Sequence, residues 1–140
     1  MNIVTTIARL LLGLLFVAAG LMAFVMTAPM PEPGLAGAFN DAFVRSHYAM
    51  FVGAAQLVLG VLLLVDRFVP VALIVLAAFL YNSFAFHATM LPVGLPVAAI
   101  VALLWFAVSW SYRRAFAALF TARPETDGAH VAKPSASTTA

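Results

Sequence analysis

The chain has 140 residues, of which 65% are hydrophobic and only 9% are charged, and this length has room for a single domain. Soluble domains carry about 25% charged residues, so this composition excludes an ordinary water-soluble globule. The net charge of +2 comes from seven basic and five acidic residues, too few and too scattered for a nucleic-acid-binding surface. Cysteine is absent, which excludes disulfides, thiolate metal sites and a cysteine nucleophile.

The apolar residues are grouped into four segments, each near the length of about 20 residues that crosses a bilayer as a helix. The predicted spans cover residues 3–26, 48–65, 69–87 and 95–112. The apolar run of the first span exceeds the 7 to 15 residues or so of a secretory signal peptide, so we interpret it as a retained helix. We therefore predict an all-α fold, an integral membrane four-helix bundle, over residues 1–120.

Two further segments are more polar than the spans. Between the first and second spans, several prolines end the helix, and Leu35, Phe39 and Phe43 then follow at helical spacing. This pattern predicts a short amphipathic helix at the membrane interface in the first outer loop, with a disordered loop as the alternative. Residues 121–140 are rich in Pro, Ser, Thr and Ala and predict a disordered cytoplasmic tail.

The basic residues predict the orientation, because lysine and arginine near membrane spans favour the cytoplasmic side. The first outer loop contains only Arg45. Most of the other basic residues fall on the opposite side of the membrane, namely Arg67, Arg113, Arg114, Arg123 and Lys133. Both termini are therefore expected inside.

Glycine spacing predicts how the first two spans pack, since helices in lipid approach closely where their residues are small. Gly13 and Gly20 share one face of the first span, and Gly53 and Gly60 share one face of the second. We expect these faces to meet. Arg9, on the same face of the first span, is expected near Asp66.

A few polar side chains interrupt the spans and define a candidate site. An unpaired amide in hydrocarbon costs several kcal/mol, so Gln56, near the middle of the second span, needs a partner such as Asn82. Together with Tyr81 and His87, these residues predict a pocket in the outer half of the bundle with His47 at its mouth. The pocket would hold a quinone headgroup or a similar small polar ligand; the alternative is that these groups only bond one another.

No catalytic residue or metal site is assigned. His47 and His87 each precede a methionine by three residues, which puts the two side chains on one helical face. Imidazole with thioether would suit copper(I), but this sequence signal is weak. The predicted spans contain no Asp or Glu, which argues against a proton-driven exporter.

Several short motifs in a fixed order carry a resemblance to a known family. They are Arg9-Leu-Leu-Leu-Gly13 with Ala19-Gly20, the proline-bearing first loop, Gln56-Leu-Val-Leu-Gly60 followed by Asp66-Arg67, Asn82 with Phe86-His87, and Trp105 before Tyr112-Arg113. On these motifs the chain resembles the DoxX family of small bacterial membrane proteins, over roughly residues 7–120. The resemblance implies a multi-pass protein of the bacterial inner (cytoplasmic) membrane, in contact with the lipid bilayer.

The resemblance also implies a function, since family members look like subunits, or relatives of subunits, of quinone-linked oxidoreductase systems. We expect an accessory or anchor subunit rather than a complete enzyme. It would bind a quinone near Asn82 and His87 and dock a soluble redox protein, and a homo-oligomer is left open. A carboxylate often stands near the position of Gln56 in the family, so the amide argues against proton transfer there.

Two other classes of protein remain open. A small-solute carrier or channel subunit would need a continuous polar path from Gln56 to both surfaces, whereas the inner halves of the spans are apolar. A purely structural membrane partner protein would need no ligand.

Overall fold

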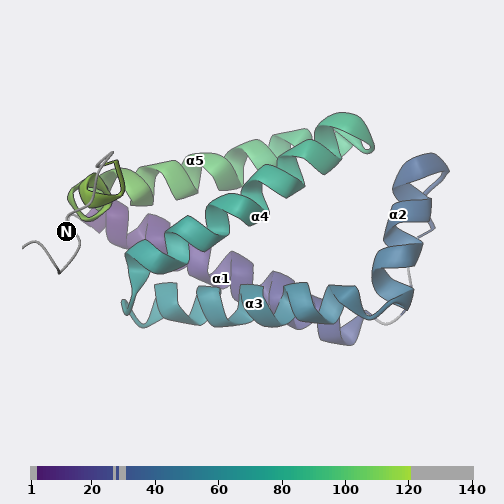
Figure 1. Cartoon of the computed structure of the whole chain (residues 1–140), viewed down its shortest axis with the longest axis horizontal. Helices are drawn as coiled ribbons and strands as arrows, with labels where there is room; N and C mark the ends of the chain where they lie inside the picture. The colour runs from purple at the N-terminus through teal and green to yellow at the C-terminus, as the bar shows by residue number, and fades with distance from the viewer. Residues whose placement is uncertain (1–2, 27, 29–30, 121–140) are drawn as a thin grey trace, which may run out of the picture.

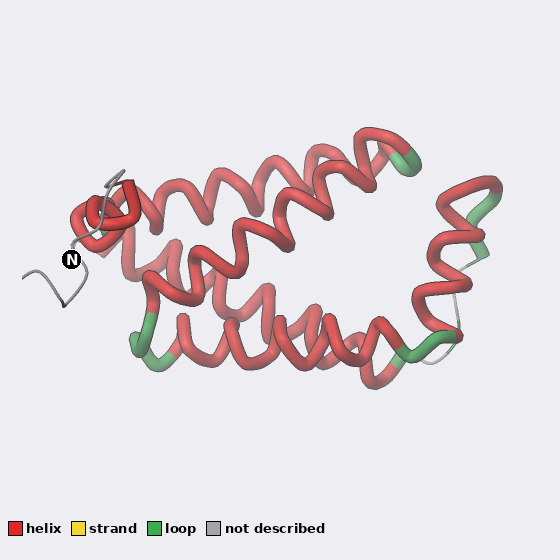
Figure 2. Tube along the Cα trace, viewed as in Figure 1, coloured by secondary structure: helices red, strands yellow, loops and turns green. Residues whose placement is uncertain are grey.

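The computed structural model describes residues 3–26, 28 and 31–120, and all regular structure in this part of the chain is helical (Figures 1 and 2). The elements are α1 (Ile3–Val25), α2 (Gly34–Arg45), α3 (Tyr48–Leu64), α4 (Val69–Thr89), η1 (Pro92–Gly94), α5 (Leu95–Ser111), α6 (Arg113–Phe116) and η2 (Ala117–Phe120). The predicted all-α class is confirmed. The predicted tail, residues 121–140, lies outside the described residues.

Three helical segments are long and apolar enough to cross a membrane, namely α1, α4 and η1 joined to α5. α3 has 17 residues, a length of about 26 Å at 1.5 Å per residue, just short of a hydrocarbon core of about 30 Å. It meets the same criterion only together with α2, and the two helices are bent by 80°. The chain therefore has three or four candidate membrane spans by length and composition.

The helix predicted in the first loop is present as α2. Pro33 precedes its first residue, and Gly34 has a φ of 71°, a left-handed value that suits glycine. The chain turns sharply again at His47, which has a φ of 63° and precedes α3. Because of this second turn, α2 stands across the end of the bundle instead of continuing into α3 (Figure 1).

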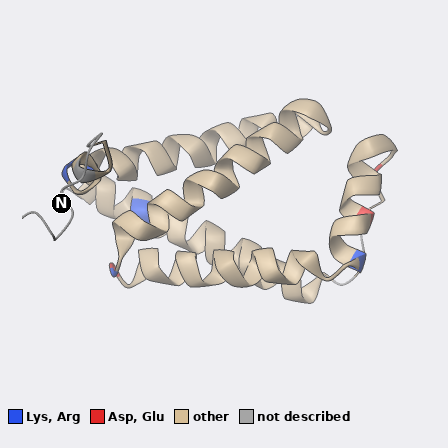
Figure 3. Ribbon diagram, in the orientation of Figure 1, with Lys and Arg blue, Asp and Glu red and all other residues tan. Residues whose placement is uncertain are grey.

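The four long helices form two antiparallel pairs, α1 with α3 and α4 with α5 (Figure 1). At one end, called here the Arg9 end, α5 also contacts α1, and a short turn joins α3 to α4. The pairs diverge toward the other end, called the α2 end (Figure 1). The charged residues lie mainly toward the two ends of the molecule (Figure 3).

Glycines allow α1 and α3 to touch backbone to backbone. A Cβ atom added to Gly20 would lie 2.7 Å from the carbonyl oxygen of Gly53, and one added to Gly60 would lie 2.8 Å from the carbonyl oxygen of Gly13. Neither helix has room for a larger residue at these positions. The two glycine faces therefore meet, as their spacing predicts.

The Arg9 end is closed by a packed core. The largest fully buried side chains lie there and come from all four long helices: Leu12, Leu63, Leu73, Leu76 and Val108. The indole Nε1 of Trp105 donates a hydrogen bond of 2.8 Å to the carbonyl oxygen of Leu73 and so ties α5 to α4.

A polar cluster seals the same end. The buried Arg9 guanidinium donates to the carbonyl oxygens of Leu63 and Leu64, which as final residues of α3 lack helical partners. Its Nε lies 3.6 Å from Oδ1 of Asp66, which confirms the predicted proximity. The Tyr112 hydroxyl donates to the same carboxylate oxygen at 3.1 Å. Burial of the ring and this hydrogen bond raise the pKa of Tyr112, which favours the protonated phenol that donates the bond.

We expect Gly53→Leu to lower the free energy of unfolding by at least about 1–3 kcal/mol, as overpacking of a filled interface does. A Cβ atom on Gly53 would overlap the Cβ of Ala23 and lie 2.9 Å from the carbonyl oxygen of Gly20. The measurement is the thermal midpoint in detergent. Ala54→Leu is the matched control, because Ala54 is the next residue and is exposed; equal midpoints for the two variants would contradict the glycine contact.

Candidate functional site

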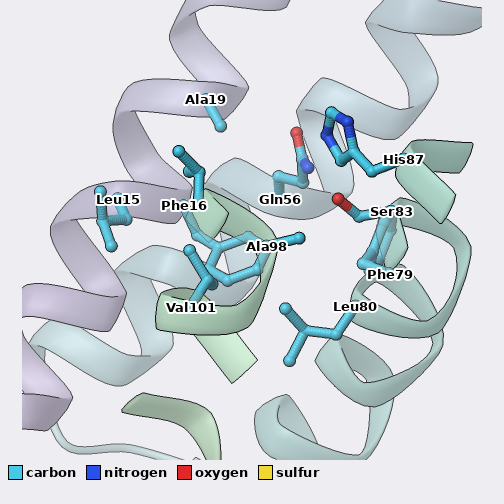
Figure 4. A pocket seen from close by; sticks show the side chains of 11 residues that line it. Leu15, Phe16, Ala19, Gln56, Phe79, Leu80, Ser83, His87, Ala98 and Val101 are labelled. Atoms are coloured by element: carbon cyan, nitrogen blue, oxygen red, sulfur yellow. The ribbon is translucent and has the colours of Figure 1, made fainter. Parts of the chain in front are cut away.

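A cavity of about 230 Å³ lies between the two helix pairs and is lined by residues of α1, α3, α4 and α5 (Figure 4). Its wall is mostly apolar and comes from α1, α4 and α5: Leu15, Phe16, Ala19, Phe79, Leu80, Val97, Ala98 and Val101. The small side chains of Ala19 and Ala98 leave space that leucines fill at the Arg9 end. Gln56, Ser83 and His87 add polar atoms that gather at one side of the cavity (Figure 4).

The side-chain amide of Gln56 lies at this cavity and has no hydrogen-bond partner among the described residues. Among the residues that the structure describes, no side chain or backbone group forms a hydrogen bond with the Gln56 amide. The expected bond to Asn82 is absent, because the Asn82 amide donates at 2.9 Å to the carbonyl oxygen of Ala78 in its own helix. The Gln56 amide is therefore available to a molecule in the cavity.

His87 is held at the edge of the cavity by its own helix end and the next turn. Its Nδ1 lies 3.1 Å from the carbonyl oxygen of Leu91. The ring packs so closely on Gly94 that a Cβ atom there would overlap ring atoms Nδ1 and Cε1. Phe86 meets the same ring edge-on, with centroids 5.2 Å apart. The orientation of the imidazole is thus fixed by a hydrogen bond and by packing.

The structure brings together two of the five predicted site residues, Gln56 and His87. Tyr81 is 77% exposed, and Asn82 is exposed as well. Successive helical residues are about 100° apart, and Ser83, rather than either of these neighbours, faces the cavity.

His47 was predicted at the mouth of the pocket, and it lies elsewhere. It is exposed before the start of α3, with its Nδ1 3.1 Å from the carbonyl oxygen of Arg45. His47 directly precedes α3 and is not among the residues that line the cavity with His87. The aromatic wall of the cavity comes from Phe16 and Phe79. Nothing in the sequence distinguishes these two from the other phenylalanines of the apolar spans.

A second cavity of about 240 Å³ lies beside the first, toward the α2 end. It is lined by side chains from α1, α2 and α3, among them Met22, Met26, Asn40, Phe43 and Val52. Ala19 and Gln56 line both cavities, so the Gln56 side chain stands between them. α2 borders the second cavity and also reaches α4, because the rings of Phe39 and Phe86 lie 5.3 Å apart.

The fold and the cavity define a small all-helical membrane protein with space for one ring-sized molecule in its bundle. The family model of DoxX matches residues 4–90, more than half of the chain, and the protein belongs to the DoxX family. This match contains all of α1 except its first residue, the whole of α2, α3 and α4, and all three polar residues of the cavity. No curated protein and no solved structure matches the chain.

We expect Gln56→Met to leave the thermal midpoint of the ligand-free protein unchanged or to raise it. Methionine keeps the volume and removes an amide that has no partner, so no protein hydrogen bond is lost. Trp105→Phe is the contrasting variant, because it removes a donor that is bonded at 2.8 Å. A fall in the midpoint for Gln56→Met as large as that for Trp105→Phe would mean that the amide is bonded within the bundle.

Proposed function

We propose that this protein is an accessory or anchor subunit of a quinone-linked redox system, with the quinone ring bound in the cavity beside Gln56 and His87. The observation that carries the proposal is the unpartnered polar edge of an otherwise apolar cavity. Ligand sites combine apolar walls with a few polar groups in this way. A cavity of about 150 Å³ accepts benzene, so about 230 Å³ suits a substituted six-membered ring.

Membership of the DoxX family supports a location in the bacterial inner membrane. We further propose a multi-pass topology in which α1, α3, α4 and α5 all cross, with both termini inside. The basic residues support this orientation, since Arg67, Arg113 and Arg114 lie at the Arg9 end and Arg45 at the α2 end. Labelling of single cysteines introduced at Arg67 and Ala88 in intact cells tests it, because the two should differ in accessibility.

The packing of the Arg9 end favours this ligand site over a small-solute carrier or channel. A conducting path would have to pass the buried leucines between the cavity and Arg9. The polar groups of the cavity do not continue through that core, because Leu12, Leu63 and Leu73 are fully buried in it. A site that opens away from the Arg9 end is sufficient for a bound ring.

We expect Ala98→Leu to abolish quinone copurification. Ala98 is buried and lines the cavity, so a leucine fills the space that the ring would occupy. The measurement is mass spectrometry of quinones extracted from the purified protein. Ala99→Leu is the matched control, since Ala99 is the next residue of α5 and is exposed.

The wild-type protein and the Ala99→Leu variant should retain quinone at equal levels, and Ala98→Leu should reach the membrane in normal amount. Wild-type protein without quinone above the level of a control membrane protein would overturn the proposal. Equal retention by both variants would place any bound quinone outside the cavity.

We also expect the affinity-tagged full chain, extracted in mild detergent, to recover a soluble protein that carries a redox cofactor. The resemblance of the sequence motifs to the DoxX family is the reason to expect such a partner. A second copy of the chain is the alternative partner, and coexpression of two differently tagged copies detects it. Recovery of this chain alone from native membranes, with no cofactor-bearing protein, would contradict the anchor role.

A further inference from the structure

The hydrogen bond at Nδ1 of His87 determines what its other ring nitrogen can do. A backbone carbonyl only accepts hydrogen bonds, so the contact of 3.1 Å to Leu91 requires that Nδ1 carries the hydrogen. In the neutral imidazole the hydrogen is then absent from Nε2, which becomes an acceptor. Turning the ring over would break the Leu91 bond, and the close packing on Gly94 opposes that movement.

Nε2 has no partner in the part of the chain that the structure describes. It belongs to a side chain that lines the cavity (Figure 4). With the imidazole neutral, the cavity therefore presents an acceptor at His87, together with an amide at Gln56 and a hydroxyl at Ser83, each of which can donate or accept.

This set of groups discriminates between the two states of a quinone ring. A quinone carries two carbonyl oxygens that only accept, so an oxygen placed at Nε2 would bring two acceptors together. A hydroquinone carries a hydroxyl in the same place, which donates to Nε2. The second oxygen of either form could meet Gln56 or Ser83 equally well.

We propose that the cavity selects a hydroxyl-bearing aromatic ring, the reduced quinol rather than the quinone, through a hydrogen bond from the ligand hydroxyl to Nε2 of His87. This inference rests on the proposed function. It adds two details: the redox state of the ligand, and the protein atom that distinguishes the reduced from the oxidised form. Tighter binding of the reduced form also raises the midpoint potential of the bound pair, by about 30 mV for each tenfold difference in affinity in a two-electron couple.

The test uses duroquinol and duroquinone, which differ only in the two hydroxyl hydrogens. Binding of each to the full-length protein in lipid nanodiscs is measured by calorimetry without oxygen. We expect duroquinol to bind about tenfold more tightly, the ratio of affinities that one net hydrogen bond gives.

His87→Phe should bind both compounds with equal affinity, because phenylalanine keeps an aromatic ring against Gly94 and Phe86 and lacks Nε2. Tyr81→Phe is the matched control. It removes one polar atom from the exposed side of the same helix and should keep the tenfold preference. If His87→Phe does not accumulate, the ¹⁵N chemical shift of Nε2 in the wild-type protein serves instead, and it should move on addition of duroquinol and not of duroquinone.

The two proposals fail in different ways. Wild-type protein that binds both compounds equally, or duroquinone more tightly, would overturn the selection of the reduced ring and leave the quinone site standing. The same holds if His87→Phe keeps the tenfold preference, or if Nε2 fails to respond to duroquinol that binds. Absence of binding of either compound would overturn the quinone site and, with it, this inference.

Discussion

The backbone contact between α1 and α3 is the constraint on which the other features of the bundle depend. In lipid, apolar side chains gain little by leaving their surroundings, so helices associate through close packing and hydrogen bonds. The paired glycines, Gly13 with Gly60 and Gly20 with Gly53, supply that packing. Gln56 lies three residues after Gly53, about 60° from it around the helix. It is therefore held at the flank of the contact, where it reaches both cavities.

The cavity exists because the bundle is closed at one end and spread at the other. At the Arg9 end, buried leucines fill the space between the pairs, and Arg9, Asp66 and Tyr112 join α1, the α3–α4 turn and the end of α5. Toward the α2 end the pairs separate, and the cavity lies between them, with the small side chains of Ala19 and Ala98 in its wall. α2 crosses this open end and contacts α4 through Phe39 and Phe86.

The polar groups of these two regions have different surroundings, and this difference indicates function. At the Arg9 end, Arg9, Asp66 and Tyr112 bond one another or a helix terminus, which stabilises the fold, and the Ser109 hydroxyl is buried there without a partner in the described part of the chain. In the cavity, the Gln56 amide and Nε2 of His87 have no partners among the described residues. Unsatisfied polar groups reduce stability, and a bound ligand that pairs with them would offset that cost.

The sequence by itself determined the class of the protein and the approximate ends of its helices. It also determined the glycine contact and the proximity of Arg9 to Asp66, and it indicated Gln56 and His87 as residues of a cavity. These features follow from local rules, since prolines end helices, glycines mark close approach and isolated polar residues stand out in apolar spans. Only the tertiary structure decided which face of α4 meets its neighbours, so that Ser83 lines the cavity and Tyr81 and Asn82 do not. It also decided that α2 is bent sharply away from α3 and that His47, at the turn between them, is exposed and outside the cavity. The physical reason is that the sequence of α4 has no periodicity that records which face packs. Residues 69–80 are apolar on every side, because lipid and protein interior select the same side chains, and the polar residues Tyr81, Asn82 and Ser83 are consecutive, so they point in different directions around the helix.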